Sequence, residues 1–249
     1  MCDSCGCGDT ERVPIEIQER ILSSNEKRAH HNREHFEDAG VLAINLMGSP
    51  GSGKTAVLEA TARARGELRI GAISGDLATD TDAERLRAAG IPAVSITTGT
   101  ACHLDAELVH KALHGVMDWQ DLDLLAIENV GNLVCPAVYD LGQAENVVCL
   151  SVTEGEDKPL KYPVMFRKAD LVLITKVDLL PHLPGVSLET LRENLAKVMP
   201  EPRSIAVSTV TGEGMEEWLN WLEVRHQVRA VLATAVLRHH HHAAHPDHG

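Results

Sequence analysis

The segment Gly48–Thr55 reads GSPGSGKT and matches the phosphate-binding pattern G-x-x-x-x-G-K-S/T in full. Its glycines let the backbone curl so that its N–H groups point at phosphate oxygens. The Lys54 ammonium would reach the β- and γ-phosphates, and the Thr55 hydroxyl would bind Mg²⁺. The alternative is a chance Gly/Ser turn, but the segment lies between an apolar run and a helical pattern. We therefore predict a nucleotide site whose phosphate loop includes Gly48, Ser49, Gly51, Ser52 and Gly53.

Acidic residues follow two other apolar runs. ENVG begins at Glu128 and stands where GTPases usually carry D-x-x-G. Glu128 would hold a Mg²⁺-bound water, and Gly131 would donate its N–H to the γ-phosphate. In SGDLATDTDAER, Asp76 follows its apolar run most closely, so we expect it to bind Mg²⁺ or to orient the attacking water. We interpret Asp80 and Asp82 as helix N-capping residues.

The identity of the nucleotide base is predicted from TKVD, which spans Thr175 to Asp178 and is close to the N-K-x-D box of GTPases. The Asp178 carboxylate would accept both the ring N–H and the exocyclic amine of guanine, whereas adenine offers a mismatched edge. Lys176 belongs to the same motif, and STVTGEG (208–214) occupies the place of the loop behind the base. Thr175 departs from the usual Asn. The motif favours GTP over ATP; the alternative is a surface Lys-x-Asp turn.

Two cysteines inside the predicted domain are candidate metal ligands. Cys102 and His103 stand at the end of one apolar run, and Cys135 follows the Glu128 motif. Both segments should leave the same edge of a parallel sheet, so the three side chains could converge. Two thiolates and an imidazole suit Zn²⁺ or Ni²⁺. From the residues alone, two separate buried cysteines are at least as well supported. We expect Cys149 in the core, and His110 and His114 on the surface.

A second cysteine cluster opens the chain, with Cys2, Cys5 and Cys7 in MCDSCGCGD. Three thiolates are one ligand short of a tetrahedral zinc site. If Met1 is removed, the free amine of Cys2 becomes a fourth ligand, and one nitrogen with three sulfurs in a plane suits square-planar Ni²⁺. The alternative is a flexible tail with incidental cysteines.

The expected elements alternate between short apolar strands and helices. This alternation predicts an α/β protein with the three-layer P-loop NTPase fold, in which helices cover both faces of a mainly parallel sheet. We expect a metal-binding tail and polar helix over 1–39, a GTPase domain over 40–235 and a His-rich tail over 236–249. The strands are expected at 41–47, 67–73, 93–98, 122–128, 146–152, 171–175 and 204–208. The helices are expected at 15–38, 54–65, 103–116 and 215–233.

The composition excludes several classes of protein. A formal net charge of −13 argues against a general nucleic-acid binder, because phosphate neutralisation needs basic patches. The apolar runs are strand-length, far short of a membrane span, and no signal-peptide pattern is visible. We therefore expect a cytoplasmic protein whose cysteines are metal ligands or core residues rather than disulfides. The C-terminal HHHHAAHPDHG is a native tail or a purification tag.

Taken in order, the motifs resemble one family. CDSCGCG, GSPGSGKT, SGDLATDTDA, TGTACHLDA, ENVGNLVCP, VTEGEDKPLKYP and TKVDL span nearly the whole chain. This set resembles the nickel-incorporation GTPases of hydrogenase maturation (HypB type), which belong to the same class of dimerising P-loop GTPases as the urease accessory GTPase. The N-terminal cysteines, and Cys102–His103 with a separate Cys135, favour the hydrogenase branch over the urease one.

The resemblance implies a homodimer, formed on GTP binding, that hydrolyses GTP to GDP. It implies delivery of nickel to a hydrogenase large-subunit precursor, together with a companion nickel chaperone. Cys102, His103 and Cys135 would hold Ni²⁺ or Zn²⁺ at or near the dimer interface. Lys161, or failing that Lys158, would reach the partner's γ-phosphate. A different interpretation is a nickel storage protein whose nucleotide domain only controls dimer assembly, and a third is a P-loop kinase of a small metabolite.

Overall fold

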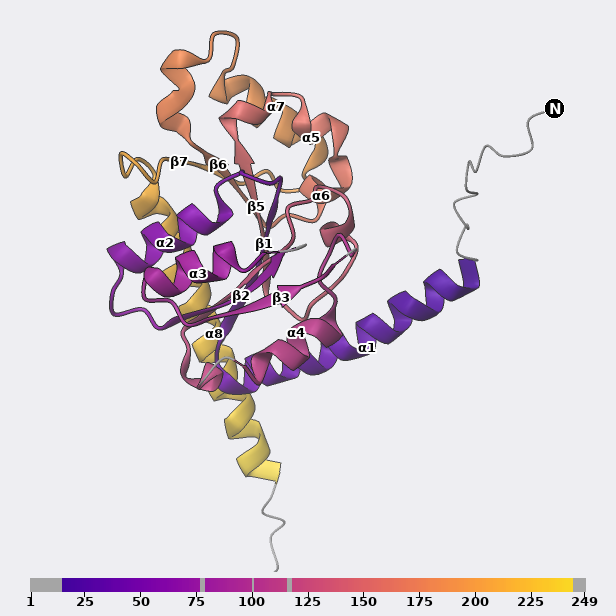
Figure 1. Ribbon diagram of the computed structural model, residues 1–249. Coiled ribbons are helices and arrows are strands. Elements are labelled where there is room, and N and C mark those ends of the chain that lie inside the picture. Colours follow the sequence, from indigo (N-terminus) through magenta and orange to yellow (C-terminus); the bar gives the residue numbers. More distant parts are fainter. Residues whose placement is uncertain (1–14, 77–78, 100, 116–117, 244–249) are drawn as a thin grey trace, which may run out of the picture.

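A seven-stranded parallel sheet forms the centre of the protein in a computed structural model (Figure 1), which describes residues 15–76, 79–99, 101–115 and 118–243. The strand order is β3-β2-β4-β1-β5-β6-β7, and every neighbouring pair is parallel. The strands are β1 (Leu42–Gly48), β2 (Ile70–Asp76), β3 (Ala93–Thr97), β4 (Leu124–Glu128), β5 (Glu145–Ser151), β6 (Leu171–Thr175) and β7 (Ser204–Val207).

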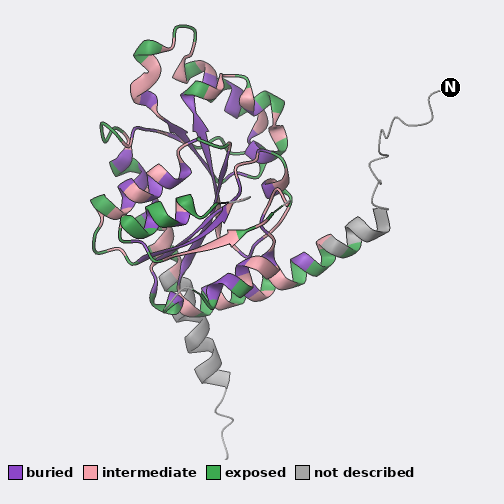
Figure 2. Cartoon of the chain, in the orientation of Figure 1, coloured by how far each residue is buried: buried purple, intermediate pink, exposed green. Residues whose placement is uncertain are grey.

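Helices cover both faces of this sheet. They are α1 (Ile15–Ala39), α2 (Lys54–Ala64), α3 (Thr81–Ala88), α4 (Ala106–Leu113), α5 (Lys158–Lys161), α6 (Pro163–Arg167), α7 (Leu188–Val198) and α8 (Met215–Ala243). The 3₁₀ turns within the described residues are η1 (Trp119–Asp121), η2 (Cys135–Ala137), η3 (Val152–Glu154) and η4 (Val177–His182). Figure 2 shows that the central strands are buried, whereas the edge strand β3 is only partly buried and the outer surfaces of the helices are exposed.

The side chains of β1 explain why the sheet has two covered faces. Successive strand residues point to opposite faces. Ile44 and Leu46 pack in the core with residues of α2, α3 and α8. Ala43 instead packs with residues of α1 and α4, and Met47 packs with residues of α6 and α7. The predicted three-layer fold is therefore confirmed.

Most predicted elements are present with shifted ends. The run expected at 67–73 forms β2 from Ile70 and continues to Asp76, because the strand pairs with β4 as far as Ser74 and with β3 as far as Asp76. The helix expected over 103–116 is shorter. It begins after Asp105, whose carboxylate accepts a hydrogen bond from the Leu108 N–H at 2.8 Å and so caps it.

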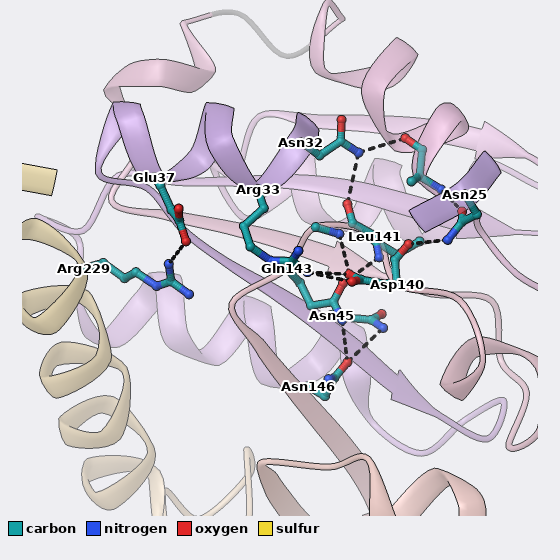
Figure 3. A network of polar contacts seen from close by, with 12 residues as sticks. Asn25, Asn32, Arg33, Glu37, Asn45, Asp140, Leu141, Gln143, Asn146 and Arg229 are labelled. Carbon is teal, nitrogen blue, oxygen red and sulfur yellow. Dashed lines mark hydrogen bonds and ion pairs between the residues drawn. The ribbon is translucent and has the colours of Figure 1, made fainter. Parts of the chain in front are cut away.

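The polar helix α1 packs along the domain rather than standing free. Phe36 is buried in the core shared with α4. The Asn32 amide, fully buried, donates to the carbonyls of Ala106 and Leu141 at 2.9 and 3.0 Å (Figure 3). Arg33 pairs with Asp140 at 2.7 Å. The division of the chain at residue 39 stays a prediction, and these contacts join the two parts of it.

The tails are described only in part. The N-terminal cluster of Cys2, Cys5 and Cys7 lies outside the described residues, and of the C-terminal tail only the backbone up to Ala243 is described, as part of α8. Within the described residues, none of the helices has both the length and the apolar character needed to cross a membrane.

Candidate nucleotide and metal sites

The phosphate loop connects the end of β1 to the start of α2. Gly48 closes β1 at φ 146°, where an added Cβ would lie 2.4 Å from the carbonyl oxygen of Cys149. Gly53, at φ 97°, is the N-cap residue of α2 and also requires a left-handed backbone. The loop therefore directs the positive N-terminal end of α2 at the same point as its own backbone N–H groups.

A cleft of roughly 460 Å³ opens beside this loop at the carboxyl edge of the sheet. It gathers residues from four segments that are far apart in the sequence, because parallel strands bring their carboxyl ends to one edge of the sheet. Predicted site residues that line it are Gly51, Gly53, Lys54, Thr55, Asp76, Glu128, Gly131 and Lys176. Gly131 lies against the loop, because an added Cβ would be 2.8 Å from Pro50.

The Thr55 hydroxyl faces two carboxylates in the cleft. Its Oγ1 lies 2.8 Å from Oε1 of Glu128 and 3.0 Å from Oδ1 of Asp82. Glu128 is 2% exposed, and its Oε2 has no hydrogen-bond partner among the described residues. Oxygen ligands of this kind are those that Mg²⁺ prefers, so the residues fit a magnesium ion. A bound Mg²⁺ would neutralise the phosphates and satisfy the unpaired carboxylate oxygen.

Asp82 corrects one prediction. The N-cap position of α3 is Asp80, which makes no side-chain capping bond and instead pairs with Arg87 at 3.0 Å. Asp82 lies inside the first turn and contacts Thr55, so the capping interpretation is wrong for Asp82, whereas Asp80 holds the N-cap position without a side-chain capping bond. The spacing did not reveal this, because Asp76, Asp80 and Asp82 share one short segment. Asp76 also lines the cleft, and the Thr79 hydroxyl donates to its carboxylate.

Burial raises the pKa of Glu128 to about 7, although Lys54 and the Thr55 hydroxyl oppose the shift. Because the pKa is raised above its unfolded value, the wild-type chain without ligands loses stability as the pH rises from about 4.5 through 7.

We expect Glu128→Gln to stabilise the nucleotide-free and Mg²⁺-free chain at pH 8 relative to wild type, by on the order of 2–3 kcal/mol more than at pH 5. Urea unfolding at both pH values measures this, with exposed Glu217→Gln as the control. If the difference in unfolding free energy between Glu128→Gln and wild type were the same at both pH values, the Glu128 carboxyl would not hold its proton in the folded chain as proposed.

The TKVD motif holds the phosphate loop from the other side. The Thr175 hydroxyl donates to the carbonyl of Ser52 at 2.6 Å, so the residue that departs from the usual Asn still contacts the loop. Lys176, at φ 60°, donates to the Gly51 carbonyl at 2.7 Å. Oδ1 of Asp178 accepts a hydrogen bond from Ser208 at 2.6 Å. The predicted base-reading carboxylate is thus adjacent to the loop that begins at Ser208.

The internal cysteine site assembles at the same edge of the sheet. The Sγ atoms of Cys102 and Cys135 are 2.8 Å apart, and Nδ1 of His103 lies 3.8 Å from the Cys102 sulfur. The three ligand atoms all lie within 4.8 Å of one another. The His103 ring stacks on Tyr139 with centroids 3.8 Å apart. The alternative of two separate buried cysteines is wrong, since both thiols are partly exposed and touch.

The electrostatics of this site favour a bound cation. The neighbouring Cys102 thiol and partial burial raise the pKa of Cys135, because two adjacent thiolates would repel each other. Burial lowers the pKa of His103, which favours the neutral imidazole that binds metals. The donor set fits Zn²⁺ or Ni²⁺, either of which would stabilise both thiolates. Cys149, in contrast, is buried in β5 as predicted, and burial raises its pKa to about 12.

Lys161 is not part of the cleft in the single chain. It is exposed and pairs with Asp157 at 2.5 Å. Lys158 lies over the ring of Tyr162. Neither ammonium lines the cleft.

Two asparagines that the sequence did not single out connect the cleft to the cysteine site. Asn129 follows Glu128 directly, and its side-chain oxygen accepts the Leu104 N–H at 3.2 Å, one residue beyond His103. Asn132 forms a β-bridge with Gly48, and its amide donates to the Cys102 carbonyl at 3.4 Å. Their place in the segment from Glu128 to Cys135 was the only indication of a role that the sequence offered. Their hydrogen-bond partners are distant in sequence and could not be predicted.

The nucleotide-binding domain model of the CobW/HypB/UreG family matches residues 42–205. A hydrogenase maturation factor HypB from Azotobacter chroococcum mcd 1 is 50% identical over 225 residues, which cover 90% of this chain and 73% of the relative. The chain belongs to the HypB family of hydrogenase maturation factors. The predicted family is therefore confirmed, and with it the prediction of a GTPase that acts in hydrogenase maturation.

Solved HypB structures have the same fold. The HypB crystal structure from Archaeoglobus fulgidus is 42% identical, with a TM-score of 0.76 over 82% of this chain and 100% of that one. HypB from Helicobacter pylori in complex with nickel is 40% identical, with a TM-score of 0.79 over 83% of this chain and 97% of that one. The nucleotide-binding fold is thus shared across the family.

Proposed function

We propose that this HypB family chain is a metallochaperone that binds nickel and releases it to a nickel–iron hydrogenase precursor under the control of GTP. The proposal rests on two hydrogen bonds that join the phosphate-sensing segment to the segment Cys102–Leu104: Asn129 accepts one from the Leu104 N–H, and Asn132 donates the other to the Cys102 carbonyl. Two thiols and an imidazole are suitable nickel ligands. The nickel complex of the H. pylori relative supports nickel as the transported ion, with Zn²⁺ as the competing occupant.

GTP would occupy the cleft with its phosphates on the loop. Lys54 would neutralise the β- and γ-phosphates, and Thr55 with Glu128 would hold Mg²⁺ or its water. Asp76 would orient the attacking water, and Asp82 is a second candidate ligand to the magnesium shell because it already contacts Thr55. Asp178 would select guanine through its two acceptor oxygens. Each role is assigned to a side chain that lies at the cleft or at the adjacent loop.

The coupling between nucleotide and metal follows from the short path between them. Gly131 would donate to the γ-phosphate, and Cys135 is only four residues further along the chain. Loss of the γ-phosphate would allow Gly131 to move. Because the neighbouring Asn132 bonds to both Gly48 and the Cys102 carbonyl, this movement would displace the Cys102 segment as well. A change of this kind is the order-to-disorder response of GTPase switch segments. It would alter the distance between the two thiolates and hence the metal affinity.

The surface around Cys135 suits a homodimer contact. Val134 and Val138 flank it and are 54% and 50% exposed. Apolar side chains grouped at a half-open metal site are typical of a surface covered in an assembly. A second copy would bury them and supply further thiolates, and Lys161 would leave Asp157 for the partner's γ-phosphate.

The N-terminal cysteines are assigned a carrier role. Cys2, Cys5 and Cys7 with the terminal amine would bind a square-planar Ni²⁺ ion ahead of α1. The companion nickel chaperone and the hydrogenase large-subunit precursor are the proposed partners, in the cytoplasm. The division into a 1–39 tail and helix, a 40–235 GTPase domain and a 236–249 tail is kept as part of the proposal.

Radioactive nickel transfer tests the function directly. The full chain is loaded with one equivalent of ⁶³Ni²⁺ and mixed with a hydrogenase large-subunit precursor and the companion chaperone. We expect transfer to the precursor to be at least several-fold faster with GTP than with GDP. Equal transfer without nucleotide would favour the storage interpretation, and transfer to a urease apoprotein alone would favour the urease one.

A further inference from the structure

Three histidines outside the cysteine site come together where α1 crosses α4. His31 and His35 lie one turn apart on α1, and His110 lies on α4. Their nearest ring nitrogens all lie within 4.8 Å of one another. None of the three residues is buried, so an ion from solvent can reach them. His110, which was expected on the surface, is partly exposed and contacts His31 and Asn32 of α1.

The His110 ring is oriented by a hydrogen bond from its other nitrogen. The buried Asn32 amide nitrogen donates to two carbonyls, which fixes its Oδ1 toward α4 (Figure 3). That oxygen lies 3.1 Å from Nδ1 of His110. Since Oδ1 only accepts, Nδ1 carries the hydrogen and Nε2 carries a free lone pair. Metal-binding histidines are held in this way, by an N–H donated to a second protein group.

The two histidines of α1 are already at metal-binding spacing. Their Nε2 atoms are 3.0 Å apart. Two imidazole nitrogens on one tetrahedral Zn²⁺ ion, at about 2.0–2.1 Å each, are roughly 3.3 Å apart. The His35 ring also packs edge-on against Trp119, with centroids 6.1 Å apart, which limits its rotation. With the ring nitrogens of His110 beside them, the three residues offer three imidazole ligands within 4.8 Å of one another.

The surroundings of His110 favour its neutral imidazole. Burial lowers the pKa of His110, and Arg28 and the other histidines lower it further. Arg28 itself is paired with Glu107 at 2.6 Å, which reduces its repulsion of a cation. The exposed His114 ring, 5.6 Å from His110, or a water can supply a fourth ligand.

We propose that His31, His35 and His110 form a binding site for a divalent transition-metal ion, Zn²⁺ or Ni²⁺, that clamps α1 onto α4. Imidazole nitrogens suit both ions. The clamp would join the helix that follows the N-terminal cysteines to the helix that follows Cys102 and His103. It is separate from the cysteine site and does not depend on nucleotide.

Thermal melting with metal tests this site in the full chain. The background variant is C102A/C135A, which removes the internal thiol ligands. Zn²⁺ and Ni²⁺ are added in separate arms at pH 7.5. An ion that binds only the folded chain raises the melting temperature, by roughly 5–10 °C at about 100 times the Kd. We expect the tails to bind metal equally in the folded and unfolded chain, so their contribution to this shift is small.

We expect the metal-induced rise in the background and in its H30A control, and its loss in H35Q and H110A. Equilibrium dialysis should show one equivalent less metal in H35Q than in H30A. H110A also removes the hydrogen bond between His110 and Asn32, so it could lower the melting temperature without metal. In that case the result for H35Q alone tests the site, because this substitution leaves the bond between His110 and Asn32 in place. A rise that persists in H35Q, or no rise in the background with either ion, overturns the site. The background lacks the internal thiols and the assay lacks GTP, so this failure leaves the nickel-transfer proposal standing.

Discussion

Lys54→Ala should reduce GTP hydrolysis by roughly 10²- to 10³-fold or more. Lys54 is 7% exposed and lies against the phosphate loop, where its Nζ donates to the Ser49 carbonyl at 3.3 Å. No other lysine is available at the same point: of the described residues that line the cleft, Lys176 is the only other one, and it is engaged with Gly51. Removing one preorganised positive group from a water-poor site costs a factor of this size. Phosphate release at saturating GTP and Mg²⁺ measures it.

The matched control is Lys111→Ala, which removes an exposed lysine of α4 that pairs with Glu107. We expect the control to hydrolyse GTP at the wild-type rate. Wild-type turnover in Lys54→Ala would contradict the assignment of the phosphate loop. Hydrogenase maturation in cells that carry only Lys54→Ala also separates the two classes of function. Maturation that survives would make hydrolysis incidental and favour a storage protein.

Replacing both Cys102 and Cys135 with serine should weaken metal binding at the internal site by roughly 10³-fold or more. Four-ligand sites gain on the order of 10–16 kcal/mol from their ligands, so the loss of two is large. The sulfurs lie 2.8 Å apart, and both belong to the same candidate site. Competition with a chelator of known affinity measures the change for Ni²⁺ and for Zn²⁺.

Cys149→Ala is the thiol control for this experiment. Cys149 is buried in β5, away from solvent, so its removal should leave metal affinity unchanged. An equal loss of affinity in Cys149→Ala and in the double variant would mean that the metal responds to general destabilisation. Unchanged affinity in the double variant would remove Cys102 and Cys135 from the list of ligands.

The sheet could be predicted because each strand is a short apolar run. The same reasoning placed Lys54, Thr55, Glu128 and Asp76 at one edge, since parallel strands end together. Asp82 was misassigned because its contact with Thr55 depends on how the segment after β2 folds back. A capping pattern in sequence carries no information about that path.

The histidine cluster and the asparagine contacts could not be predicted from the sequence, because they too depend on how distant segments pack. Three whole strands, β1 to β3, lie between His31 and His110 in the sequence, and only the packing of α1 on α4 brings the two residues together. Asn129 and Asn132 look like ordinary loop residues until their partners Leu104, Gly48 and Cys102 are known. A single hydrogen bond between two distant segments leaves no periodic pattern in the sequence, so it cannot be predicted from one.

The central claim is that the γ-phosphate alters metal affinity through the segment from Glu128 to Cys135. The most direct measurement is the Ni²⁺ dissociation constant of a variant that lacks the N-terminal thiols, C2A/C5A/C7A, with GDP and with a non-hydrolysable GTP analogue. Allosteric coupling of this kind is typically worth 5- to 150-fold in affinity, and we predict a difference of at least about 5-fold. Equal dissociation constants in the two nucleotide states would contradict the account.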